Sequence, residues 1–279
     1  MAARSGTIAK ELIKNAEKLG LHEKTVEDVR VGLTYVAVKL SGNDSCCGIG
    51  HVLRSELPTH CFRAEALYPM IGRNASELAE LILEPDPLLP SIGIATINAV
   101  FSEHAEKLRG VLKGDVVDSL KLEDDDVVGM VGNFVPIVRR LEGRVKEIRI
   151  LERKVMDTCK PKSQDIKCGC DEFVKYYPDW AWEDVLPECD VAIITASTIV
   201  NRTLDSLISA CAGKAREVAL VGPTTTLAPE VFRHHGVTFL GGVRISSSRK
   251  VMEIISQGGG MNVFGNGAEK ISLRIGKTL

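Results

Sequence analysis

The chain has 279 residues, of which 44% are hydrophobic and 26% are charged, and its formal net charge is -2. This composition is that of an ordinary globular protein, and the small net charge gives no electrostatic reason to expect nucleic acid or an anionic membrane as a partner. A chain of this length predicts two domains, because single hydrophobic cores stop growing at roughly 250–300 residues.

The sequence also predicts where the protein resides. No apolar run approaches the ~20 residues that a membrane span requires. The amino terminus, M-A-A-R-S-G-T-I-A-K-E-L, has no apolar core of the kind found in signal peptides. We therefore expect a cytoplasmic protein with no membrane partner, whose eight cysteines are reduced thiols available for metal or redox chemistry.

The first part of the chain, residues 1–110, predicts a small α+β domain in which a strand pair precedes helices. Helical spacing of apolar residues, β-branched alternation and an Asn N-cap define its elements. These elements are a helix over Ile8–Leu19, a strand over Val29–Leu40, its hairpin partner over Cys46–Leu53, a helix from Asn74 to near Glu84, and a buried helix over Ser91–His104.

Residues 111–126 form the expected connecting segment. Their pattern is charged and irregular, and they end in the acidic run Glu123-Asp124-Asp125-Asp126. Such a run is most simply a solvated linker, and a divalent-cation site is the less favoured alternative.

From residue 127 to residue 279 the pattern alternates between strand and helix. Val127–Val131 is a short apolar run that breaks at Gly132 and leads into a helix, which is typical of the first βα unit of an open parallel sheet. Further strands are expected over 145–151, 190–195, 217–221 and 237–240, helices over 136–142, 201–212, 229–234 and 246–256, irregular chain over 156–177, and a loop-like tail from residue 258.

The turn after this first strand is a candidate ligand site, because ligands of open parallel sheets bind beyond the carboxyl ends of the strands. Glu152 lies 20 residues after Gly132, where a dinucleotide-binding fold places its ribose-binding acid. Asn133 and Phe134, however, stand where the G-x-G-x-x-G pattern requires glycine, so NAD is not the expected cofactor. The alternative is a structural glycine turn with an exposed glutamate.

Polar residues follow two other strands of the expected sheet. Thr195 ends one strand and Asn201 follows it, and Gly222-Pro223-Thr224 ends the next. Hydroxyls and backbone N–H groups at such ends suit a carboxylate or phosphate. Helix capping explains Asn201 equally well but explains the threonines after Gly-Pro less well.

Cys46, Cys47 and His51 are candidate metal ligands, because thiolates and imidazole suit transition metals. Adjacent cysteines do not match the C-x2-4-C spacing of structural zinc sites, and a buried cysteine can be simply a small hydrophobic residue. Trp180 and Trp182 could stack on a planar ligand, but packing over the sheet is the favoured interpretation.

Taken together, several segments resemble a family described as putative heavy-metal chelation proteins. The segments that carry the resemblance occur in the family's order and are V-R-V-G-L-T-Y-V-A-V, S-I-G-I-A-T-I-N-A-V, V-G-M-V-G-N-F, I-L-E-R, D-V-A-I-I-T-A-S-T-I-V-N-R-T-L, V-A-L-V-G-P-T-T-T-L-A-P and Q-G-G-G.

The resemblance implies a domain similar to the enolase amino-terminal domain, a Rossmann-like domain after it, and a site in the cleft between them. The candidate residues that it implies there are Asn98, Gly132, Asn133, Phe134, Glu152, Thr195, Asn201, Gly222, Pro223 and Thr224.

We therefore expect the cleft to bind or process a small anionic ligand, a metal ion or a metal complex, with a transition metal as the possible cofactor. Two alternatives remain open, a dinucleotide-dependent enzyme and a cysteine-based metal carrier without turnover. The protein could also form a homo-oligomer.

Overall fold

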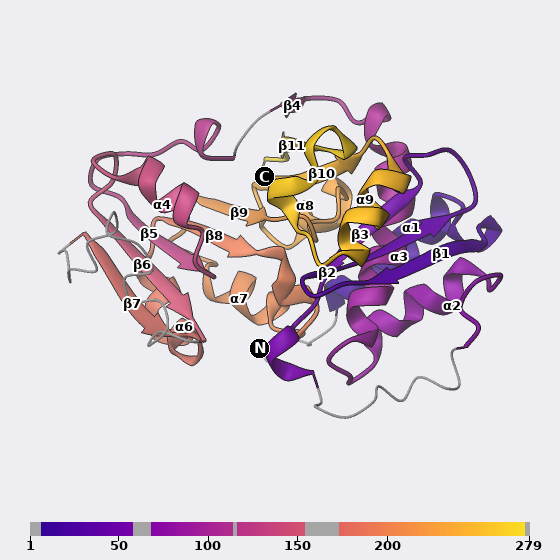
Figure 1. Cartoon of the computed structure of the whole chain (residues 1–279). Coiled ribbons are helices and arrows are strands. Elements are labelled where there is room, and N and C mark those ends of the chain that lie inside the picture. The colour runs from indigo at the N-terminus through magenta and orange to yellow at the C-terminus, as the bar shows by residue number, and fades with distance from the viewer. Residues whose placement is uncertain (1–6, 58–67, 114–115, 154–172, 277–279) are drawn as a thin grey trace.

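The computed structural model describes residues 7–57, 68–113, 116–153 and 173–276. The chain forms two sheets, one of three strands and one of eight, with helices packed around them (Figure 1). None of the helices in these ranges is long and apolar enough to cross a membrane.

The smaller sheet is antiparallel and consists of β1 (Val26–Val31), β2 (Tyr35–Leu40) and β3 (Cys47–His51) in that order. The prediction of one strand over Val29–Leu40 was wrong, because the chain turns at Gly32, whose N–H donates to the Tyr35 carbonyl. A Cβ at Gly32 would lie 2.3 Å from the backbone carbonyl oxygen of Ile255, so this close approach requires glycine.

Helix α3 (Leu89–His104) lies directly on this sheet and is buried along most of its length, as its apolar sequence predicted. A Cβ at Gly48 or Gly50 of β3 would lie 2.1 Å from a carbonyl oxygen of α3. These glycines therefore allow the helix and strand to approach closely. Helix α1 (Thr7–Lys18) and helix α2 (Ala75–Ala79), the latter capped by Asn74, complete this part of the fold.

The larger sheet has the strand order β4-β11-β10-β9-β8-β5-β6-β7. The six strands from β10 to β7 are parallel to their neighbours, while β11 is antiparallel to both β10 and β4. The strands are β4 (Val111–Lys113), β5 (Val127–Val131), β6 (Glu147–Glu152), β7 (Val174–Pro178), β8 (Val191–Thr195), β9 (Glu217–Val221), β10 (Phe239–Ile245) and β11 (Ala268–Arg274). The predicted α/β class, with a mostly parallel sheet preceded by a smaller α+β unit, is confirmed.

Three details of this sheet differ from the sequence prediction. Strand β10 runs through Gly241 and Gly242, where the strand was expected to end, because its pairing with β11 continues to Ile245. Strand β11 lies in the expected loop-like tail, and β7 lies at the end of the segment expected to be irregular. The remainder of that irregular segment falls outside the described residues, apart from Phe173.

The helices of this part are short, and their contacts join it to the first part. They are α4 (Val135–Leu141), α6 (Trp182–Val185), α7 (Leu204–Ala210), α8 (Pro229–His234) and α9 (Ser248–Ser256). Helix α9 packs against β1 and β2, and one hydrophobic cluster contains residues of β2, β3, β10 and α9. The expected connecting segment contributes β4 to the larger sheet. The core is therefore continuous between the two parts of the chain.

Candidate functional site

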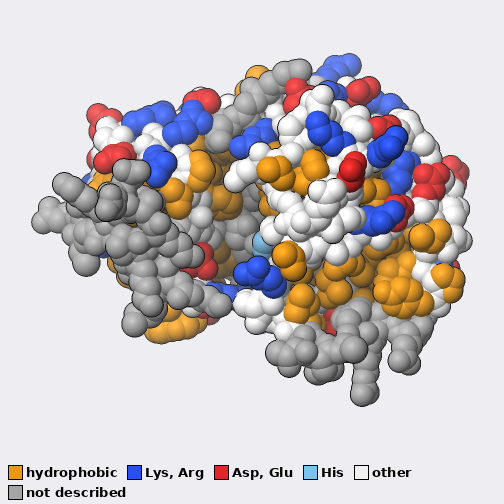
Figure 2. Space-filling view, in the orientation of Figure 1, with side chains coloured by type: hydrophobic (Ala, Val, Ile, Leu, Met, Phe, Trp, Pro, Cys, Tyr) orange, Lys and Arg blue, Asp and Glu red, His pale blue; other side chains and the backbone are white. Residues whose placement is uncertain are grey.

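A cavity of about 800 Å³ lies where the strand order of the larger sheet reverses. From β5, the chain adds β6 on one side and β8 on the other, so the loops that follow β5 and β8 diverge. Such a crevice is the usual ligand site of an open parallel sheet. The lining comes from these loops and from the segment that follows β3, and Figure 2 shows the surface hollowed between the two lobes.

The turn after β5 is shaped by Gly132 and held by Glu152. Gly132 has φ of 87°, and a Cβ there would lie 3.2 Å from the Thr195 side chain, so glycine fits best. One carboxylate oxygen of Glu152 accepts a hydrogen bond from the Asn133 backbone N–H at 3.1 Å, and the other accepts from the Arg153 backbone N–H at 2.9 Å. Glu152 therefore braces the turn with both of its oxygen atoms.

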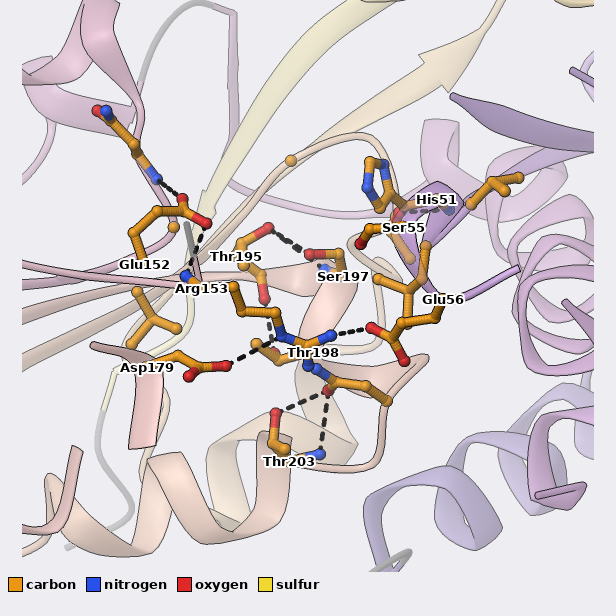
Figure 3. Close-up of a pocket in the computed structure, with 18 of the residues that line it drawn as sticks. His51, Ser55, Glu56, Glu152, Arg153, Asp179, Thr195, Ser197, Thr198 and Thr203 are labelled. Atoms are coloured by element: carbon orange, nitrogen blue, oxygen red, sulfur yellow. Dashed lines mark hydrogen bonds and ion pairs between the residues drawn. The ribbon is translucent and has the colours of Figure 1, made fainter. Parts of the chain in front are cut away.

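The loop after β8 carries three hydroxyl groups into the cavity lining. Thr195 Oγ1 and Ser197 Oγ are 2.9 Å apart, and Thr198 Oγ1 donates to the Thr195 carbonyl at 2.6 Å. Because only one proton is needed between Thr195 and Ser197, the other hydroxyl proton of that pair remains available. Figure 3 shows these side chains along one wall of the cavity.

Asn201 does not cap a helix in the way the sequence suggested. Helix α7 begins at Leu204 with Thr203 at the N-cap position. The Asn201 side-chain oxygen instead accepts from the Thr203 backbone N–H at 3.3 Å and from the Thr203 hydroxyl at 2.7 Å. The oxygen of this amide is thus occupied, and its NH₂ group has no acceptor among the residues that the structure describes.

The loop after β9 is held against the first part of the chain. Thr224 Oγ1 accepts from the His51 backbone N–H at 3.0 Å, and the Thr224 carbonyl accepts from Asn98 Nδ2 at 3.0 Å. Asn98 is 7% exposed, and it also donates to the Ile49 carbonyl and accepts from the Thr226 hydroxyl. Asn98 is therefore a tie between helix α3, strand β3 and this loop, and it lies outside the cavity.

The segment after β3 forms the opposite wall and includes His51, Arg54, Ser55 and Glu56. The His51 ring meets the edge of the Tyr35 ring at a centroid distance of 5.6 Å. Burial lowers the pKa of the His51 imidazole below its ordinary value. The ring is consequently neutral at physiological pH, and a neutral imidazole is the form that binds metal ions.

An ion-pair cluster crosses the cavity between its two walls. Arg153, at the end of β6, pairs with Glu56 of the segment after β3 and with Asp179 after β7, the latter at 3.0 Å (Figure 3). All three side chains are more than a third exposed, so the cluster contributes modestly to stability. Its position nevertheless links the two parts of the chain across the cavity.

Nine of the ten predicted ligand-binding residues line this cavity, and Asn98 is the exception. The nine are Gly132, Asn133, Phe134, Glu152, Thr195, Asn201, Gly222, Pro223 and Thr224. Sequence reasoning missed the segment from Val52 to Glu56, together with Arg153 and Asp179. Two sequence signals could have indicated the last two residues: Arg153 directly follows the candidate residue Glu152, and Asp179 directly precedes Trp180, which was considered for stacking on a ligand.

The structure does not bring Cys46, Cys47 and His51 together. Cys46 and Cys47 belong to different hydrophobic clusters and are both fully buried, and Cys47 and His51 stand at opposite ends of β3. Burial raises the pKa of each thiol to about 12, so neither is a thiolate at neutral pH. Only His51 of these three lines the cavity.

Two other expectations need correction. Trp180 was expected to pack over the sheet, but it is 74% exposed at the edge of the cavity, whereas Trp182 is partly buried against the core. The acidic run was expected to be most simply a solvated linker. Its last residue, Asp126, is 2% exposed and forms a bidentate ion pair with Arg216.

Two family models cover most of the chain, and both carry the description putative heavy-metal chelation. The model DUF4213 matches residues 13–101, and the model DUF364 matches residues 115–274. An uncharacterized protein of Methanocaldococcus jannaschii is 25% identical over 248 residues, which cover 87% of this chain and 86% of that protein.

Two solved structures of proteins with unknown function share the fold. The structure from Pyrococcus horikoshii has a TM-score of 0.76 at 23% identity and covers 96% of this chain and 100% of its own. The structure from Desulfitobacterium hafniense has a TM-score of 0.73 at 22% identity and covers 97% of this chain and 98% of its own. Both are members of the DUF364 family. The chain therefore belongs to the DUF364 family, which is described as putative heavy-metal chelation.

Proposed function

We propose that the protein binds a small chelating molecule together with its metal ion in the cavity between the two walls. The observation that carries this proposal is the surplus of hydrogen-bond donors in the lining. Chelating molecules present carboxylate, phosphate, hydroxamate or phenolate oxygen atoms, which are acceptors, so a donor-rich cavity suits them.

The donor surplus follows from the hydrogen bonds of each group. Thr224 Oγ1 accepts from His51, and its own proton has no acceptor among the described residues. One proton of the Thr195 and Ser197 pair is likewise available, as is the Asn201 NH₂ group. Two loops, the one that follows β8 and the one that follows β9, thus direct donors into the same cavity, where a ligand oxygen atom can accept more than one hydrogen bond.

The size of the cavity favours a complex over a bare ion. A volume of about 800 Å³ lies in the range typical of small-molecule sites, roughly 300–1,000 Å³. A bare transition-metal ion needs a compact shell of ligand atoms at about 2.0–2.3 Å. The described lining contains no cysteine, and its one imidazole is that of His51. A metal that arrives already held by an organic ligand needs only one such protein atom, and neutral His51 is suited to supply it.

The two alternatives receive less support. In a dinucleotide-dependent enzyme Glu152 would bind a ribose hydroxyl, yet both of its oxygen atoms already accept backbone hydrogen bonds. In a cysteine-based carrier Cys46 and Cys47 would share an ion, but their buried side chains belong to separate clusters. Neither residue lines the cavity.

The test is to identify what the untagged protein retains after purification. Native mass spectrometry would detect the organic compound, and elemental analysis would detect the metal. The combined variant Thr195→Val, Ser197→Ala is expected to lower the retained compound at least tenfold, since it removes two hydroxyls from the lining. His51→Gln is expected to lower the metal content more than the content of the organic compound.

The matched control is Ser256→Ala, which removes a hydroxyl that bonds within helix α9 and is not part of the cavity lining. This variant should retain compound and metal like the wild type. Unchanged retention in the Thr195 and Ser197 variant, or an equal loss in the Ser256 control, would contradict the proposal.

A further inference from the structure

Arg54 differs from every other charged side chain of the described cavity lining, because its charge has no partner. Arg153 is engaged by Glu56 and Asp179, and the Glu152 carboxylate accepts two backbone N–H groups. Arg54 lines the same cavity and is exposed, and no hydrogen bond or ion pair of its guanidinium occurs in the part of the chain that the structure describes. Its five N–H donors therefore have no acceptor among the described residues and can bind a ligand.

Arg54 lies close in the chain to the contact between the segment after β3 and the loop after β9. Arg54 begins the short 3-10 helix after β3, and it follows His51 by three residues. The His51 backbone N–H donates to Thr224 Oγ1 in the loop after β9. The three residues from His51 to Arg54 span at most about 10 Å, so the Arg54 backbone lies near this contact. Arg54 and Thr224 both line the cavity, so a ligand bound there is offered both the Thr224 hydroxyl and the Arg54 guanidinium.

The overall charge of the lining limits what can bind there. Glu56, Glu152 and Asp179 outnumber Arg54 and Arg153, so the charged lining has a formal excess of one negative charge. A compound with several uncompensated negative charges would meet net repulsion from this lining. A compound with one remaining anionic group, and with its other charges neutralised by a bound cation, satisfies Arg54 without that repulsion.

We propose that Arg54 is the specificity-determining residue of the cavity, binding one carboxylate or phosphate oxygen pair of a metal-loaded chelate and so favouring the loaded form over the metal-free polyanion. This inference rests on the proposed function. It adds the charge state of the bound ligand and the residue that recognises that charge. Guanidinium is well matched to the task because its planar fork binds carboxylate and phosphate in a bidentate manner.

The experiment uses defined probes on the untagged full-length protein. Calorimetric titrations would compare nickel(II) nitrilotriacetate and nickel(II) citrate with the same chelators free of metal, and inorganic phosphate would serve as a further arm. The wild type is expected to bind at least one nickel chelate, and to bind it at least tenfold more tightly than the metal-free chelator. Phosphate binding that matches the chelate would identify a simple anion site and overturn the preference for the loaded form.

Variants separate the charge of Arg54 from its bulk. Arg54→Gln should weaken binding of the nickel chelate by about ten- to a hundredfold, the effect of losing a charged hydrogen bond. Arg54→Lys should recover part of that loss, because it keeps the positive charge. Arg153→Gln is the matched control: it removes a paired arginine, so it should lower the unfolding temperature more than Arg54→Gln does.

Outcomes that contradict the inference are distinct from those that contradict the proposed function. Equal chelate affinity in the wild type and Arg54→Gln, tighter binding of the metal-free chelators, or no binding of either nickel chelate would overturn the role of Arg54. A native compound that co-purifies undiminished with Arg54→Gln would overturn it while leaving the proposed function intact. Absence of any co-purified compound or metal from the wild type would count against the proposed function itself.

Discussion

Replacement of Asn98 by alanine tests whether the loop after β9 depends on its buried hydrogen bonds to helix α3. The Asn98 side chain makes three hydrogen bonds, with the Ile49 carbonyl at 2.9 Å, the Thr224 carbonyl at 3.0 Å and the Thr226 hydroxyl at 2.6 Å. Each such bond contributes about 1 kcal/mol net, and the partners that remain are buried without replacement. We expect Asn98→Ala to lower the free energy of unfolding by about 3 kcal/mol.

The assay is urea denaturation followed by circular dichroism, with thermal unfolding as a second measure. A loss of about 3 kcal/mol corresponds to a fall of roughly 6–12 °C in the unfolding midpoint for a chain of this size. Thr96→Val is the matched control, because Thr96 is also buried in α3 but its hydroxyl bonds only to the Ile92 carbonyl of the same helix. A loss below about 1 kcal/mol for Asn98→Ala, or an equal loss for the control, would refute the reasoning.

Three further predictions concern buried or half-buried groups of the first part of the chain. Gly48→Ala should lower the free energy of unfolding by roughly 1–3 kcal/mol, because its Cβ would lie 2.1 Å from a carbonyl oxygen of α3. The Cys46 and Cys47 thiols, with pKa values of about 12, should resist alkylation by iodoacetamide at pH 8 until the protein unfolds, as read by peptide mass mapping. Burial alone would raise the pKa of Glu103, but the hydrogen bond and charge of Lys24 hold that pKa below its ordinary value. Glu103→Gln should therefore destabilise the protein at neutral pH, and its difference from the wild type should vanish as the pH falls through the lowered pKa.

Each of these predictions has a control and a contradictory outcome. Gly260→Ala places a Cβ 3.6 Å from its nearest neighbour, which is ordinary contact, so it should cost less than Gly48→Ala. Rapid alkylation of Cys47 in the folded protein would show that the thiol is accessible. A Glu103→Gln effect that stays constant from pH 7 to the acid range would show that the carboxylate charge is not the source of the stabilisation.

The sequence predicted the turns at the strand ends because the conformation of such a turn depends on its own few residues. Gly132 and Gly222 both have positive φ, and such turns select for glycine whatever surrounds them. The order of strands and helices then placed both turns at the carboxyl edge of one parallel sheet. This is why nine of the predicted residues line a single cavity.

Other features depend on contacts between distant segments, which no local pattern reveals. Arg54 lies in the cavity lining because the segment after β3 is fixed to the loop after β9 through His51 and Thr224. Cys46 and Cys47 are neighbours in sequence, but successive side chains of an extended chain point to opposite faces, so they enter different clusters. Asn98 was predicted to bind the ligand, but it does not line the cavity, and its hydrogen bonds fix the loop after β9 to strand β3.

The location of the metal complex is the central claim, and anomalous diffraction tests it most directly. Crystals of the protein grown with nickel(II) nitrilotriacetate would be measured on both sides of the nickel absorption edge. We expect one strong anomalous peak inside the cavity near the His51 ring, with the chelator extending towards Arg54 and Thr224. A peak beside Cys46 and Cys47, or at the acidic residues 123–126, with no chelator density in the cavity, would contradict it.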